Sequence, residues 1–193
     1  MRRITTAAAA AASLLLLTVL AACAPDPAPT TPASTPPAVA EQTGTPTPTT
    51  TPTAAPAVAL PTDCRAIVSA AVLAQLQDQP LNDKAFGPTG VQSDGSLICV
   101  WGSPSADTTN LTTTISYIDR GPALDAMNAF REKGATCYTP DEGTRCERTW
   151  KNKQYPVTDG RTMFWRDGVM IDTQYSNLAP DGYTASLVAH IFG

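Results

Sequence analysis

The uneven distribution of proline most constrains how this chain folds. Eleven of its 18 prolines lie between Ala24 and Thr62, where threonine, alanine and serine fill the gaps and charged residues are few. Such a segment offers too little apolar surface to offset the backbone entropy that folding costs. We therefore expect a disordered Pro/Thr-rich spacer over residues 23–62. Residues 63–193 then form one folded domain, which is long enough to bury a core of its own.

The residues ahead of the spacer have the layout of a bacterial export signal. Arg2 and Arg3 precede an apolar run from Ala7 to Leu20, and two small residues follow. Residues 20–23 read Leu-Ala-Ala-Cys, the form of a lipobox, in which the cysteine is acylated and becomes the first mature residue. We expect a signal peptide over residues 1–22 and a lipid anchor on Cys23, outside the cytoplasmic membrane. The alternative is an ordinary secretory signal followed by a leftover thiol.

The charge of the expected domain bounds its partners. Without Arg2, Arg3, Asp26 and Glu41, which lie outside it, 11 Lys and Arg stand against 15 Asp and Glu, a net charge of −4. An acidic domain repels a phosphate backbone, so we expect no nucleic-acid partner. This net negative charge also argues against a polybasic patch that binds anionic lipids, so we expect the lipid anchor to attach the protein to the membrane.

Four cysteines remain in the domain, and they permit three pairings. The segment Pro140–Gly143 has turn-forming residues, and a four-residue loop there would place Cys137 directly opposite Cys146 in a hairpin. This arrangement favours the pairs Cys137–Cys146 and Cys64–Cys99. The cysteines are widely spaced and the chain has one histidine, so we expect disulfides rather than a metal site, and no cofactor.

Hydrophobic periodicity predicts an α+β domain with a mostly antiparallel sheet and two to three helices packed on one face. The expected helices span residues 65–79, with Asp63 as the cap, residues 122–133, and a stretch after Pro180; the expected strands span residues 97–101, 111–118, 161–166 and 169–173. Asp167 and Gly168 predict a tight type I′ hairpin turn. Tyr117 and Pro122 have the same spacing as Tyr175 and Pro180, which fits two ββα units as well as a chance repeat.

A run of basic and aromatic residues is the candidate binding surface. It suits an anionic cell-wall polymer or an envelope protein, whereas the alternative is a solvated edge strand that resists aggregation. The three tryptophans, Trp101, Trp150 and Trp165, would line a ligand groove or, alternatively, pack against the sheet. The candidate residues are Arg145, Arg148, Trp150, Lys151, Lys153, Tyr155 and Trp165.

Catalytic patterns are weak, so we expect no enzyme. His190 is the only imidazole, and the paired carboxylates Asp141 and Glu142 fall in an expected turn, where acids are common anyway. The sequence has no Gly-x-Ser-x-Gly elbow and no phosphate-binding glycine-rich loop. The leading hypothesis is a non-catalytic binding or accessory lipoprotein. A small cell-wall hydrolase using those three residues, and a sensor or partner subunit of a membrane complex, are the alternatives.

The lipobox, the Thr/Pro spacer, Cys64 at the start of a helix and Cys99-Val100-Trp101 on a strand together resemble small actinobacterial lipoproteins of unknown function. In one such family a cysteine before the first helix and a Cys-x-Trp strand recur. The resemblance implies a non-enzymatic α+β envelope domain and supplies no catalytic residues. The pair Cys137 and Cys146 is additional to that pattern.

Overall fold

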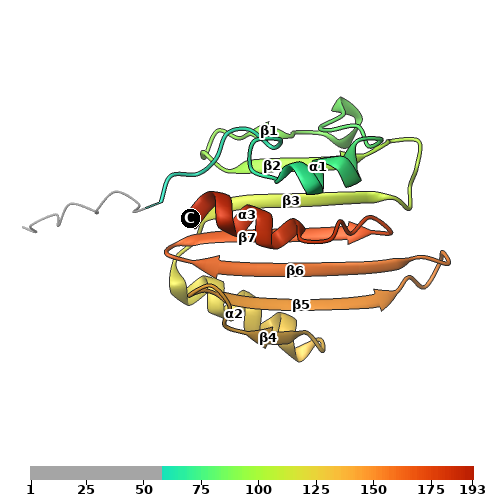
Figure 1. Cartoon of the computed structure of the whole chain (residues 1–193). Coiled ribbons are helices and arrows are strands. Elements are labelled where there is room, and N and C mark those ends of the chain that lie inside the picture. Colours follow the sequence, from blue (N-terminus) through green and yellow to red (C-terminus); the bar gives the residue numbers. More distant parts are fainter. Residues whose placement is uncertain (1–57) are drawn as a thin grey trace, which may run out of the picture. The chain divides into compact units, whose positions relative to one another are not determined.

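The computed structural model describes residues 58–193 (Figure 1). The predicted signal peptide, Cys23 and most of the predicted spacer lie outside the described residues. None of the helices within residues 58–193 is long and apolar enough to cross a membrane.

A seven-stranded antiparallel sheet forms the centre of the domain, which confirms the predicted α+β class. The strand order is β1-β2-β3-β7-β6-β5-β4, so the central strand β7 pairs with β3, which comes from a distant part of the chain. The strands are β1 (Gly90–Val91), β2 (Leu97–Gly102), β3 (Asn110–Tyr117), β4 (Thr136–Tyr138), β5 (Thr144–Lys151), β6 (Thr158–Arg166) and β7 (Val169–Ser176).

Two hairpins form where the sequence predicts them. Asp167 and Gly168 adopt φ angles of 48° and 82° between β6 and β7, the left-handed pair that a type I′ turn requires. Cys137 of β4 lies opposite Cys146 of β5, and the two are bonded. The second favoured pair, Cys64–Cys99, is also bonded and ties the segment before the first helix to β2.

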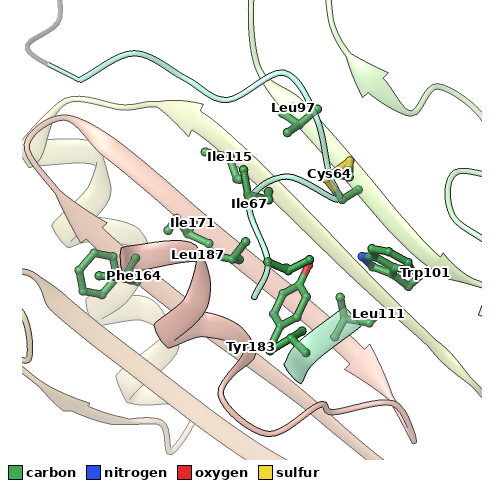
Figure 2. Packing of buried hydrophobic residues seen from close by; sticks show 14 of the residues in the cluster. Cys64, Ile67, Leu97, Trp101, Leu111, Ile115, Phe164, Ile171, Tyr183 and Leu187 are labelled. Carbon is green, nitrogen blue, oxygen red and sulfur yellow. A yellow bond between two sulfur atoms is a disulfide. The ribbon is translucent and has the colours of Figure 1, made fainter. Parts of the chain in front are cut away.

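The main core lies on one sheet face, which we call the front face and which carries Thr113, Phe164 and Ile171. Helices α1 (Ala70–Leu76) and α3 (Tyr183–Phe192) cover this face. Figure 2 shows Leu187 and Tyr183 of α3 above the strands, and Trp101 is fully buried in the same cluster. Trp101 therefore contributes to the core rather than to a groove.

Helix α2 (Arg120–Glu132) packs on the opposite face, which we call the back face and which carries Cys146, Met163 and Met170. Consecutive strand residues point to opposite faces, so Met163 and Phe164 separate the two clusters. Two helices, α1 and α3, thus share one face, within the predicted two to three, and α2 lies on the other. The order of two strands and a helix does occur twice, as β2-β3-α2 and β6-β7-α3. An antiparallel repeat would keep both helices on one face, so the second unit is not a copy of the first.

The start of the domain also differs from the prediction. Asp63 accepts hydrogen bonds from the amides of Arg65 and Ala66, but these residues form only turns. The helix begins at Ala70, where the Ser69 side chain caps it. Val58 and Leu60, which we assigned to the spacer, pack against the main core, so the folded part extends to at least residue 58.

Candidate functional site

A groove opens on the front face where α3 begins. It has a volume of about 300 Å³, and strands β5, β6 and β7 form its floor while the chain from Ala179 to Ala185 forms its wall. Its side chains reach it because they occupy alternate positions on paired strands. These residues are Arg145 and Glu147 of β5, Thr162 of β6, and Thr173 and Tyr175 of β7.

The β5 side of the groove holds a connected polar cluster. A guanidinium nitrogen of Arg145 lies 2.7 Å from a carboxylate oxygen of Glu147. The Tyr138 hydroxyl donates a 2.8 Å hydrogen bond to the other Glu147 oxygen, and the Arg145 guanidinium lies 5.8 Å from the centre of the Tyr138 ring. Arg145 Nε is buried without a hydrogen-bond partner among the described residues, so the cluster does not satisfy every donor of this guanidinium.

Tyr175 forms the β7 side of the groove, directly above Gly160 of β6. Burial raises the pKa of the Tyr175 phenol, and the nearby Glu147 carboxylate raises this pKa further, while Arg145 lowers it. Burial is also the largest cause of the raised pKa of Tyr138, followed by its hydrogen bond to Glu147. Both phenols therefore keep their protons near neutral pH and are hydrogen-bond donors there.

The groove continues across β5 toward the edge of the sheet. A second depression of about 470 Å³ shares Glu147, Thr162 and Tyr175 with the first and extends to Thr136 and Arg148. The continuous surface offers hydroxyls, one ion pair and aromatic rings, which is a chemistry that suits a hydroxyl-rich ligand. Within residues 58–193, no three His, Cys, Asp or Glu side chains lie where they could hold a metal ion.

The structure divides the predicted binding surface. Arg145 lies in the groove, whereas Arg148 and Trp150 project from the back side of β5, since they occupy the alternate positions. Arg148, Trp150, Lys151 and Lys153 line a separate depression with Lys133.

The other two predicted residues lie elsewhere. Trp165 packs against the back-face cluster beneath α2, and its indole nitrogen donates a 3.0 Å hydrogen bond to the Ile118 carbonyl. Tyr155 lies in the loop after β5, and its hydroxyl accepts a hydrogen bond from Gln154. Neither residue lines the depression around Trp150.

The three residues of the hydrolase alternative do not share a cavity among those described. Asp141 and Glu142 form the β4–β5 turn with φ angles of 50° and 57°, and the Glu142 side chain, 82% exposed, pairs with Arg166 at 2.8 Å. His190 lies in the last turn of α3 and lines another depression with Ser69 and Ser186. Asp141 and Glu142 thus act as residues of the β4–β5 turn, and Glu142 also pairs with Arg166 there.

Sequence reasoning did not identify the groove residues Glu147, Thr162, Thr173 and Tyr175, nor Tyr138, which contacts Glu147 beside the groove. A signal was present, because the Asp167-Gly168 turn fixes the register that places Thr162 opposite Thr173. No local sequence pattern predicted that the start of α3 would pack beside these strands and form the wall of the groove.

Comparison of the chain with protein-family models, curated proteins and solved structures gave no match.

Proposed function

We propose that this protein is a lipid-anchored, non-catalytic binding protein on the extracytoplasmic side of the cell membrane. The lipobox at Cys23 supports the anchor. The front-face groove, with its connected cluster of Tyr138, Glu147 and Arg145, is the observation that carries the binding role. In this proposal the membrane is reached through the lipid, and the ligand is a component of the cell envelope.

The ligand is a small hydroxyl-rich unit of a cell-wall polymer. Its hydroxyls match the groups that line the groove, since Thr162 and Tyr175 each supply a hydroxyl. Arg145 and Glu147 neutralise one another on the groove floor, and Asp181 in the wall adds one negative charge. A volume of about 300 Å³ is at the small end of ligand pockets and suits one or two sugar rings.

The anchor is tested on the full-length chain in bacteria that are fed a labelled fatty acid. The wild-type protein should carry the label and sediment with membranes, whereas Cys23→Ala should carry none. The matched control is Thr35→Ala in the spacer, which should behave as the wild type does. An unlabelled wild-type protein would refute the anchor.

The groove is tested by titrating the detergent-solubilised full-length protein with the disaccharide unit of bacterial peptidoglycan. Thr162→Val removes one hydroxyl without changing the side-chain shape, and it should weaken binding about tenfold. Tyr155→Phe removes a hydroxyl outside the groove and should leave binding unchanged. Equal affinity of Thr162→Val and the wild type would remove the groove from the proposal, and cleavage of the disaccharide would favour a hydrolase.

A further inference from the structure

Positive charge gathers at the exposed end of β5. Lys133, at the end of α2, joins Arg148, Lys151 and Lys153 around a depression of about 520 Å³ that Trp150 also lines. None of the described residues that line it is acidic. The chain as a whole has a net charge of −4, so this depression runs against its average charge.

The neighbouring ion pair explains why Arg148 has no acidic partner within residues 58–193. Arg148 lies opposite Arg161 in the β5–β6 register, and like charges in that position repel. Asp172 of β7 binds Arg161 through two hydrogen bonds of 2.8 and 2.6 Å, so this carboxylate is already engaged. Among the described residues, Arg148 instead donates to the Lys133 carbonyl. Its charge is held in place and remains uncompensated.

The depression is accessible because β4 is short. β4 pairs only with Arg145–Glu147 of β5, so the following residues of β5 lie at the free edge of the sheet (Figure 1). Trp150 is 37% exposed there, and the Arg148 guanidinium lies 5.7 Å from the centre of its indole ring. An aromatic face and several cations are thus presented side by side.

We propose that this basic edge, the surface formed by Lys133, Arg148, Trp150, Lys151 and Lys153, binds an anionic glycan. The cations hold its phosphate or carboxylate groups, and the Trp150 indole stacks against the apolar face of a sugar ring. This inference goes beyond the proposed function, because it adds a second site with a different ligand charge. Arg148 also lines the depression next to the groove, so a polymer chain has a path between the two sites.

A glycan fits better than a membrane or a nucleic acid. A bilayer or a duplex presents a broad anionic surface, and this would be repelled by the acidic remainder of the domain. A single flexible polymer strand contacts only the edge. The exposed indole would add little to binding of a simple inorganic anion, which has no ring to stack.

The test measures binding of the full-length protein to phosphorylated dextran, with unmodified dextran as the uncharged polymer of the same backbone. We expect tighter binding of the phosphorylated form, and this difference should shrink as salt screens the charges. Arg148→Gln combined with Lys153→Gln should weaken binding about tenfold. Trp150→Leu should weaken binding to phosphorylated dextran but leave binding to inorganic polyphosphate unchanged.

Lys84→Gln is the matched control, since it removes an exposed cation far along the chain from the basic edge. It should leave the affinity unchanged, and an equal loss would show that net charge alone governs binding. Equal binding of unmodified dextran, or tighter binding of oligothymidylate or phosphatidylglycerol vesicles, would overturn the inference. Thr162→Val should not alter phosphodextran binding, so a failure here is distinguishable from a failure of the groove.

Discussion

Gly160 of β6 lies directly opposite Tyr175 of β7, and the phenol ring occupies the space that a side chain at position 160 would fill. A Cβ atom on Gly160 would lie 2.2 Å from Cζ of the Tyr175 ring. Because Gly160 has no side chain, the Tyr175 ring can lie over β6. This contact fixes the β7 side of the groove.

We predict that Gly160→Ala destabilises the domain and disturbs the groove. The added methyl group forces the Tyr175 ring to move, and overpacking of this kind costs about 1–3 kcal/mol. Urea unfolding of the full-length protein measures the loss. The control is Gly121→Ala in α2, where an added Cβ meets nothing within 4 Å, so stability should be unchanged or slightly higher. Equal stability of both variants would show that Tyr175 does not depend on this space.

A buried hydroxyl chain links α3 to the centre of the sheet. The Tyr183 hydroxyl lies 3.0 Å from Oγ1 of Thr113, which lies 3.0 Å from Oγ1 of Thr173. Tyr183→Phe should lower the free energy of unfolding by about 1–2 kcal/mol, because one buried hydrogen bond is lost. Urea unfolding measures the change, and Tyr155→Phe on the exposed loop is the control that should have no effect.

The same chain predicts non-additive effects. Because Thr113→Val removes both hydrogen bonds of Thr113, adding Tyr183→Phe to it should cost less than Tyr183→Phe costs alone. Strict additivity in the double-mutant cycle would mean that the two hydroxyls act independently.

Local signals were enough to predict the fold class, both disulfides and the tight hairpin. The Asp167-Gly168 turn and the facing pair Cys137 and Cys146 act within about ten residues, where turn geometry decides the structure. The face on which each helix packs was not predictable in this way. Helix α2 has apolar residues at helical spacing, but this pattern does not state which side of a sheet they will meet.

The candidate site was predicted only in part, for a related reason. The basic residues lie close together in sequence, but strand alternation sends Arg145 to the front face and Arg148 to the back. Applying the two-residue period to residues 144–151 would have separated them. Lys133 was not predictable, because only the packing of α2 brings the end of that helix to the edge of β5.

Stability should fall at alkaline pH because of Tyr183. Burial raises the pKa of its phenol to about 12 in the folded protein, above the ordinary value of 10.0. Between these values the unfolded chain has released a proton that the folded chain retains, so folding becomes less favourable as pH rises. The full loss amounts to about 3 kcal/mol, and the contribution is constant below pH 10.

Urea unfolding at pH 9 and at pH 11 measures this dependence. Tyr183→Phe should reduce the slope between the two values. The slope should not vanish, because burial also raises the pKa values of Tyr138 and Tyr175, which contribute with the same sign. An unchanged slope in Tyr183→Phe would contradict the assignment.

The two disulfides should differ in their contribution to stability. Cys64 and Cys99 are separated by 35 residues and Cys137 and Cys146 by nine, so the first bond restricts the unfolded chain more. The chain-entropy model gives about 4 kcal/mol for the first and about 3 kcal/mol for the second. Replacing each pair by alanine and measuring urea unfolding tests this order.

Cys64 and Cys99 are both buried in the main core, so their loss also removes packing and widens the difference. A larger loss from the short-loop pair would show that the β4–β5 hairpin, rather than the restriction of the unfolded chain, determines what these bonds contribute.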